Sequence, residues 1–251
     1  MNITILTLFP DMVKTVLDTS MLGRAQTAGA VNFSVRNLRD WGTGIHQNVD
    51  DSPYGGGAGM LLRVDVMDAA LAELTGSKNQ ESGPPAGQAG IKGLRPRIIL
   101  MTPQGTPFNQ EKAEALASDG RDLILIAGHY EGFDERIRLL VDEEISAGDY
   151  VLTGGELPAL IVTDAVTRLL PSALGSDESS KEESFSLMVS NQRVLEYPHY
   201  TRPDKYTPIS KEIGEQSVPE ALKSGNHGAI ATWRQEQSIE KTRSKRPDLI
   251  V

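Results

Sequence analysis

Short apolar runs alternate with amphipathic stretches through the first two-thirds of the chain. The apolar runs predict strands at Asn2–Leu8, Val31–Leu38, Arg97–Thr102, Asp122–Ala127 and Glu144–Ser146. The helical pattern covers Asp11–Leu17, Val64–Leu74, Asn109–Ala117, Asp134–Val141 and Glu156–Leu170. The runs at Arg97–Thr102 and Asp122–Ala127 are almost continuously apolar, which is typical of strands buried on both faces of a parallel sheet. The alternation predicts an α/β fold: an open, mostly parallel sheet with helices on both sides.

Two polar segments interrupt this pattern. The first, Thr75–Pro96, is rich in Gly, Pro, Ser and Gln and indicates a surface excursion. The second, Pro171–Glu183, carries a cluster of Ser and acidic residues that is typical of a disordered segment or a hinge. We therefore predict an α/β domain over residues 1–171, an interdomain linker over 172–185 and a small helical domain over 186–251.

The last part of the chain has no strand pattern. Val218–Lys223 and Ala229–Arg243 have helical patterns, and Asn226 is a candidate N-cap. The formal net charge of the whole chain is −9, which argues mildly against a nucleic-acid partner. From Arg202 onward, however, nine Lys and Arg outnumber seven Asp and Glu, and four of these cations lie in Lys241–Arg246. This basic tail is either a solvated helix end or part of a nucleic-acid surface.

Composition narrows the chemistry. The chain has no cysteine, which excludes disulfides, cysteine-ligated metal centres and a thiol nucleophile. No apolar run approaches the ~18 residues of a membrane span. The first residues lack the basic flank and the cleavage site of a secretory signal. We therefore expect a cytoplasmic protein.

Three glycine-rich or polar loops follow the predicted strands. They are Thr102–Gly105, Gly128–Arg136 and Gly148–Ala159. Ligands of open α/β sheets bind beyond the carboxyl ends of the strands, and glycines there let the backbone approach a ligand closely. Each loop alone is more often a plain turn than a ligand site, but the three together predict a ligand site.

A fourth loop, Asp50–Met60, is also rich in glycine. It matches neither the phosphate-binding P-loop nor the dinucleotide G-x-G-x-x-G motif. It is either a flexible surface loop or a shaped loop that holds a planar or anionic ligand. The four histidines show no spacing that predicts a metal site. The residues alone thus indicate a ligand-binding α/β protein without specifying a reaction.

A series of short motifs runs in order along nearly the whole chain. They are Thr7–Pro10, Pro53–Gly57, Gly59–Met60, Pro103–Gly105, Tyr130–Gly132, Asp134–Arg136, Gly148–Leu152, Gly154–Pro158, Pro198–Pro203, Ser224–His227 and Arg246–Pro247. The series closely resembles the bacterial tRNA (guanine-N1)-methyltransferases, the TrmD family of the SPOUT superfamily. The resemblance implies that the three strand-end loops form a deep trefoil knot at the C-terminal end of the α/β domain, with a small helical domain after it.

The resemblance also implies S-adenosyl-L-methionine as the methyl donor. The donor-binding residues it implies are Thr102, Gln104, Gly105, Gly128, Tyr130, Glu131, Gly132, Ser146, Ala147, Tyr150, Leu152, Gly154, Gly155 and Pro158. Among them, Glu131 would approach the positive sulfonium group. The family is also described as using Mg²⁺, for which the sequence indicates no ligands.

Catalysis and tRNA binding are implied by the same resemblance. Glu183 falls at the position of the general base, where the family more often has Asp, and Arg168 would stabilise charge on the guanine oxygen. His129 stands where the family often has Arg. The residues implied to bind the tRNA substrate are Tyr54, Gly55, Gly56, Gly57, Gly59, Arg202, Lys205, Asn226 and His227. The family works as a homodimer that shares its active sites between subunits.

The implied target is N1 of the guanosine that is 3′-adjacent to the anticodon. Two alternatives remain at this point. One is a related methyltransferase that modifies a ribose hydroxyl or a ribosomal RNA base. The other is a non-catalytic nucleotide-sensing or RNA-binding module, which the acidic net charge suits.

Overall fold

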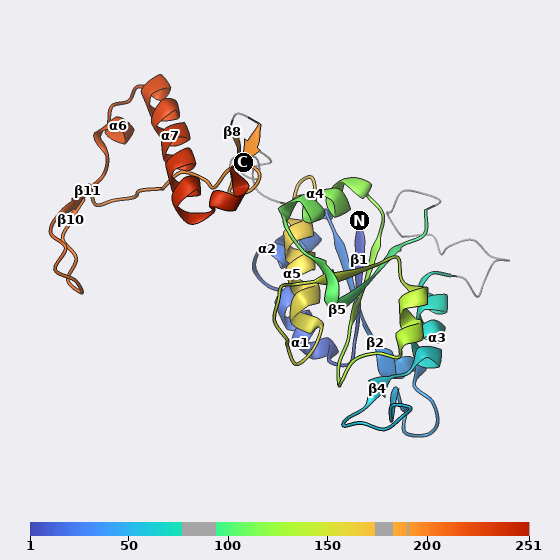
Figure 1. The fold of residues 1–251 in the computed structure, drawn as a ribbon. Helices are drawn as coiled ribbons and strands as arrows, with labels where there is room; N and C mark the ends of the chain where they lie inside the picture. The colour runs from blue at the N-terminus through green and yellow to red at the C-terminus, as the bar shows by residue number, and fades with distance from the viewer. Residues whose placement is uncertain (77–93, 174–182, 190, 251) are drawn as a thin grey trace. The chain divides into compact units, whose positions relative to one another are not determined.

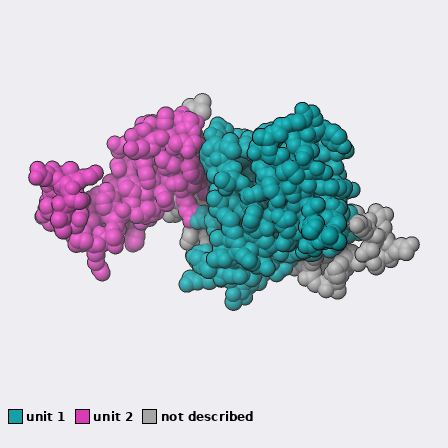
Figure 2. Space-filling model, turned by 90° about the horizontal axis from the view of Figure 1, so that it is seen from below, with its two compact units in different colours: residues 1–176 teal, residues 177–251 magenta. Residues whose placement is uncertain are grey.

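The computed structural model describes residues 1–76, 94–173, 183–189 and 191–250 (Figure 1). The predicted excursion at Thr75–Pro96 and the predicted linker at 172–185 therefore lie largely outside the described residues. The chain divides into two compact units, Met1–Ser176 and Asp177–Val251, which are coloured separately in Figure 2.

The first unit is built on a five-stranded sheet. Its strands are β1 (Asn2–Thr7), β2 (Asn32–Asn37), β5 (Arg97–Pro107), β6 (Leu123–Ala127) and β7 (Glu143–Ser146). They lie in the order β2-β1-β6-β5-β7, and every neighbouring pair is parallel. The predicted strands and the parallel sheet are confirmed, with small differences at the strand ends.

Strand β5 departs from the prediction because it continues to Pro107 through an irregularity. Met101 and Thr106 both pair with Ile145 of β7, so the residues between them are pushed out of the ladder. The predicted loop Thr102–Gly105 is thus a bulge within one strand. The apolar run ends at Thr102, and the pattern beyond it carried no sign of further pairing.

Helices cover both faces of the sheet (Figure 1). One face carries α1 (Pro10–Leu17), α2 (Ser20–Thr27), α4 (Gln110–Asp119) and α5 (Glu156–Thr167), and the other carries α3 (Val64–Leu74) with the 3₁₀ helices η1 (Leu38–Trp41) and η2 (Glu135–Leu140). Ile99 packs in the first core and its neighbour Leu100 in the second. The continuously apolar strands are therefore buried on both faces, as predicted.

Three local predictions differ from the structure. Helix α2 was not predicted, because only Leu22 and Ala25 of its residues are buried and Gly23 weakens the helical signal. The segment predicted as a helix at Asp134–Val141 is the shorter 3₁₀ helix η2. A small hairpin of β3 (Asp50–Asp51) and β4 (Leu61–Leu62) encloses the fourth glycine loop.

The second unit contains α6 (Glu220–Lys223), α7 (His227–Lys245) and the 3₁₀ helix η3 (Pro247–Leu249). It also contains two short ladders, β8 (Met188–Val189) with β9 (Gln192–Arg193) and β10 (Lys205–Tyr206) with β11 (Gln216–Ser217). The predicted C-terminal helix is confirmed. The two short ladders were not predicted, because strands of two residues leave no periodic pattern. The N-cap is confirmed: the Asn226 side chain accepts hydrogen bonds from the N–H groups of Gly228 and Ala229.

Candidate functional site

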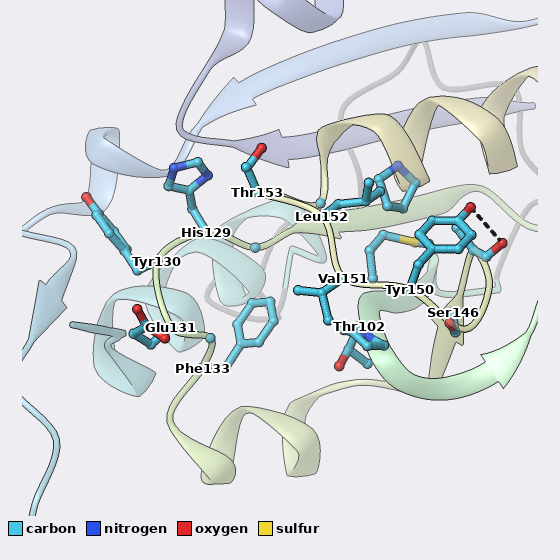
Figure 3. Close-up of a pocket in the computed structure, with 18 of the residues that line it drawn as sticks. Thr102, His129, Tyr130, Glu131, Phe133, Ser146, Tyr150, Val151, Leu152 and Thr153 are labelled. Carbon is cyan, nitrogen blue, oxygen red and sulfur yellow. Dashed lines mark hydrogen bonds between the residues drawn. The ribbon is translucent and has the colours of Figure 1, made fainter. Parts of the chain in front are cut away.

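A cavity of about 160 Å³ lies at the carboxyl ends of β5, β6 and β7 (Figure 3). Residues from all three strand-end loops line it. In Figure 3, Tyr130 and Glu131 lie at one edge of the group of side chains, and Tyr150 and Ser146 at the opposite edge. Of the predicted donor-binding residues, all except Gln104 and Gly105 line this cavity. The structure therefore brings together residues that are about fifty positions apart in the sequence.

Two glycines allow the second and third loops to touch. The N–H of Gly155 donates a hydrogen bond to the carbonyl of Gly128 at 2.7 Å. A Cβ atom at position 155 would lie 2.6 Å from the backbone nitrogen of Gly128, which no side chain could tolerate. A Cβ atom at position 128 would collide with the Phe133 ring. A larger residue at position 155 would push the two loops apart, and one at position 128 would displace the Phe133 ring from the cavity wall.

The third loop is held by its own hydrogen bonds and presents apolar side chains. The Ser146 hydroxyl donates to the Gly148 carbonyl at 3.0 Å, and the Tyr150 hydroxyl donates to the Ala147 carbonyl at 3.2 Å. Tyr150, Val151 and Leu152 line the cavity yet remain partly exposed, Val151 at 85%. Exposed apolar groups around a cavity are the usual lining of a site for a planar organic ligand.

Gln104 and Gly105 are placed at the sheet edge instead of the cavity wall. The Gln104 side chain accepts a hydrogen bond from Arg138, which also forms an ion pair with Glu144. Gly105 packs on β7, where a Cβ atom would lie 2.5 Å from the carbonyl carbon of Glu144. The bulge in β5 explains this placement, because it turns Thr102 and Pro103 toward the cavity and the next two residues toward β7.

The cavity also has lining residues that were not predicted. They are Met101, Pro103, His129, Phe133, Gly148, Val151 and Thr153. All lie within or next to the three predicted loops, so the loops themselves were the available signal. The sequence could not tell which residues of an irregular loop face inward, since such loops have no period.

The motif at Thr7–Pro10 contacts residues of the loops that line the cavity. The Glu156 carboxylate is buried, and it accepts a hydrogen bond from the Thr7 hydroxyl at 2.7 Å. The ring of Phe9 lies 4.8 Å from the ring of His129. The end of β1 thus contacts both the second loop and the start of α5, which accounts for a motif outside the cavity.

The fourth glycine loop, Asp50–Met60, is shaped by its backbone. Gly55, Gly56, Gly57 and Gly59 all have positive φ, at 85°, 79°, 140° and 77°. Glycine adopts this region without the strain that other residues incur, so the loop has a specific conformation that only glycine allows easily. The Tyr54 side chain at its tip is fully exposed. The structure favours the shaped loop over the flexible one.

This loop is attached to the second cavity loop. The N–H of Glu131 donates to the carbonyl of Met60 at 3.1 Å, and the N–H of Leu62 donates to the carbonyl of Gly132 at 3.0 Å. Farther along, the hydrogen bond from the Arg136 guanidinium lowers the pKa of the Asp134 carboxyl to about 2. The Asp134–Arg136 pair is therefore ionised at every physiological pH.

Arg168 lies at the other end of α5 from the cavity. It follows the last residue of the helix, whereas Gly155 and Pro158 line the cavity at its first turn. The 12 residues of α5 span about 18 Å at about 1.5 Å per residue. Arg168 and the cavity of the same chain therefore do not face one substrate atom together.

The remaining predicted residues lie in the second unit. Glu183 is half-buried in a turn, where its carbonyl accepts hydrogen bonds from the N–H groups of Ser186 and Leu187. Lys205 forms an ion pair with Glu215 at 3.1 Å. The other three are Arg202, which is exposed, Asn226, which caps α7, and His227, which begins that helix.

Two negative findings concern only the part of the chain that the structure describes. None of its helices combines the length and the apolar character needed to cross a membrane. Among the same residues, no group of three or more His, Asp or Glu is placed to hold a metal ion. We assign no residue to the Mg²⁺ that the resemblance implies.

Comparison with known proteins identifies the family. A family model described as tRNA (guanine-1)-methyltransferase TrmD matches residues 1–251. The tRNA (guanine-N(1)-)-methyltransferase of Syntrophomonas wolfei is 45% identical over 251 residues, which are all of this chain and 91% of that protein. The proteins of the same name from Moorella thermoacetica and Brevibacillus brevis are 46% and 47% identical, again over the whole chain and over 90% and 91% of theirs. The chain therefore belongs to the TrmD family of tRNA (guanine-N1)-methyltransferases.

Proposed function

We propose that this methyltransferase transfers the methyl group of S-adenosyl-L-methionine to N1 of the guanosine that is 3′-adjacent to the anticodon of tRNA. The observation that carries the proposal is the cavity at the ends of β5, β6 and β7, lined by residues of all three implied donor loops. Membership of the family supports both the reaction and tRNA as the substrate.

The residues of the cavity fit such a donor. Val151 and Leu152 offer an apolar surface to a planar adenine. Glu131 offers a negative charge to a cationic sulfonium. The trefoil knot that the family implies needs the second and third loops to pass each other closely. The hydrogen bond from Gly155 to Gly128 is in keeping with that arrangement.

The proposed chemistry separates methyl supply from proton removal. The bound donor would supply an electrophilic methyl group, whose bond to sulfur breaks as its bond to guanine N1 forms. The Glu183 carboxylate removes the N1 proton and so makes the N1 lone pair available for attack. The Arg168 guanidinium donates hydrogen bonds to O6, where negative charge develops as the proton leaves. Because no metal ligands are assigned, no step is derived from Mg²⁺.

The two ends of α5 support an active site that is shared between two copies of the chain. Arg168 lies a helix length from the cavity of its own chain, so a second copy would bring it to that cavity. The helices α1 and α5, which pack together, expose an apolar face to which Met12, Val16, Leu157 and Ile161 contribute, each between 42% and 49% exposed. An apolar face of this kind is typical of a protein–protein interface.

The second unit is proposed to bind the tRNA. Arg202, Lys205 and the cations of Lys241–Arg246 would contact phosphates. Asn226 and His227 lie at the N-terminus of α7, the helix that carries this basic tail. The target guanine would leave its stack to reach the Asp50–Met60 loop and the donor cavity. Recognition of an exposed loop base by shape is the usual mode for folded RNA.

Incubation with unmodified tRNA transcripts and methyl-labelled donor tests the proposal. Reverse transcription of the product is expected to stop at the guanosine 3′ of the anticodon, because a methyl group on N1 blocks base pairing. Incorporation at a ribose or in ribosomal RNA would instead support the related methyltransferase with another target. Donor binding without any incorporation would support the non-catalytic module.

A further inference from the structure

The fourth glycine loop and the donor cavity meet at one pair of residues, Gly59 and Glu131. The backbone of Glu131 is fixed there, because its N–H donates to the carbonyl of Met60. Its side chain lies against Gly59: a Cβ atom at position 59 would lie 3.0 Å from the Glu131 carboxyl carbon, 2.9 Å from its Oε1 and closer still to its Cγ. The Glu131 side chain thus occupies the space that any other residue at 59 would fill.

Gly59 differs in this respect from the other glycines of the loop. A Cβ atom at Gly55 or Gly56 would meet nothing within 4 Å, and one at Gly57 would meet only the Pro53 ring at 3.5 Å. The φ angles of Gly56 and Gly59 are nearly the same, at 79° and 77°. Both need glycine for their backbone, but only Gly59 needs it for a neighbouring side chain as well.

We propose that Gly59 is a positioning residue for the donor site. By leaving room for the Glu131 side chain, it keeps that carboxylate at the cavity wall, where Glu131 lines the site (Figure 3). The inference rests on the proposed function, in which Glu131 approaches the donor sulfonium. It adds that the loop proposed to hold the target guanine also sets the affinity for the donor.

A coupling of this kind is reciprocal. If the loop conformation fixes Glu131 in place, donor binding to Glu131 must stabilise the same loop conformation. Occupation of the donor site then favours the loop conformation that holds the target base. The structural path is short and continuous, from Glu131 through the contact with Gly59 and the hydrogen bond to Met60.

The test is calorimetric titration of the purified Gly59→Ala and Gly29→Ala variants with two ligands. S-adenosylmethionine carries the sulfonium charge, and S-adenosylhomocysteine has a neutral sulfur. Gly59→Ala is expected to lower the affinity for S-adenosylmethionine about tenfold, which is the effect of losing one charge-assisted contact. The affinity for S-adenosylhomocysteine is expected to fall by less than about twofold. Gly29→Ala, which lies outside the site with nearly the same φ of 75° and has no neighbour within 4 Å, is expected to change neither affinity by more than about twofold.

An equal loss of affinity for both ligands in Gly59→Ala would overturn the proposal, because general disruption of the loop does not depend on the charge on sulfur. Equal losses in the two alanine variants would overturn it as well. Circular dichroism and thermal unfolding of both variants establish that they are folded to the same degree.

A double-mutant cycle with Glu131→Gln isolates the contact. In the Glu131→Gln background, Gly59→Ala is expected to cause no further loss of S-adenosylmethionine affinity, whereas additive losses would refute the positioning role. Failure of the proposed function is distinguishable: absence of methyl incorporation into tRNA would reject the reaction and leave the sulfonium-specific effect of Gly59→Ala intact.

Discussion

Different kinds of contact stabilise the interior of each of the two units. The first unit has two apolar cores on either face of its sheet. Among the described residues of the second unit, Val194 and Tyr197 are the buried hydrophobic ones, and Ser238 and Thr242 of α7 are buried as well. Polar contacts replace the missing core, such as the hydrogen bond from the Leu195 N–H to the Thr242 hydroxyl at 2.9 Å.

Cations stacked on aromatic rings add to the second unit. The Arg234 guanidinium lies 4.5 Å from the centre of the Tyr197 ring, and Arg246 lies 5.5 Å from that of Phe185. Such contacts contribute about 0.5–1 kcal/mol each at exposed sites, less than a well-filled core. The donor cavity is therefore built on a rigid unit, whereas the proposed general base and tRNA contacts lie in a unit of marginal stability.

The largest expected effect separates chemistry from donor binding. Glu183→Gln and Arg168→Ala are each expected to lower single-turnover methyl transfer by roughly 10²–10⁴, because one loses the general base and the other the cation at O6. Donor affinity, measured by titration, is expected to stay unchanged, since neither residue lines the cavity. Glu183→Asp, which keeps a carboxylate, is the matched control and is expected to retain turnover. Full turnover in Glu183→Gln would reject the base assignment.

A second prediction concerns the apolar face of α1 and α5. Ile161→Glu places a charge on this face and is expected to halve the molar mass in solution and to abolish turnover, since the proposed shared active site needs two chains. Light scattering after size-exclusion chromatography measures the mass. Ala115→Glu, at an exposed position of α4, is expected to change neither property. A monomeric wild-type protein with full activity would contradict the shared site.

A third prediction tests the marginal scaffold of the second unit. Asn226→Ala removes the N-cap of α7 and is expected to destabilise that helix by about 1 kcal/mol. Affinity for tRNA, measured by filter binding, is expected to fall, while donor affinity stays as it is. Asn226→Asp keeps the capping oxygen and is expected to preserve tRNA binding. Equal loss of donor affinity in Asn226→Ala would show that the two units do not respond separately.

The smallest expected effect comes from the Asp134–Arg136 pair. The folded-state pKa of Asp134 is about 2, below its ordinary value of 3.8, so this pair stabilises the folded state fully above about pH 4. That contribution is lost as the pH falls from about 4 toward 2. Asp134→Asn is therefore expected to lower the thermal unfolding temperature slightly at pH 7 and not at pH 2. An equal shift at both pH values would contradict the ionic origin.

The sheet could be predicted from the sequence for a physical reason. Strands such as Arg97–Thr102 and Asp122–Ala127 must be apolar on both faces to be buried, and this leaves a continuous run that can be seen directly. The short ladders of the second unit pair only two residues of each strand and leave no such run. The rest of that unit depends on contacts between residues distant in sequence, which no local pattern reports.

The candidate site was predictable in its loops but not in its details. Glycines at 128 and 155 marked the loops that meet, whereas the bulge that turns Gln104 and Gly105 away from the cavity depends on where β7 pairs. Glu183 and Arg168 came only from the resemblance to the family. A carboxylate among serines and a cation at a helix end have no local feature that distinguishes them from ordinary surface charges.

The order of the strands also bears on how the chain must be synthesised. Strand β1 is made first, yet it lies inside the sheet between β2 and β6. Its second edge therefore waits for Leu123–Ala127 to leave the ribosome. A product truncated before residue 123 would expose the unpaired edge of an apolar strand, which is a template for aggregation. Premature termination in the first half of the message is therefore expected to yield insoluble fragments with no donor site.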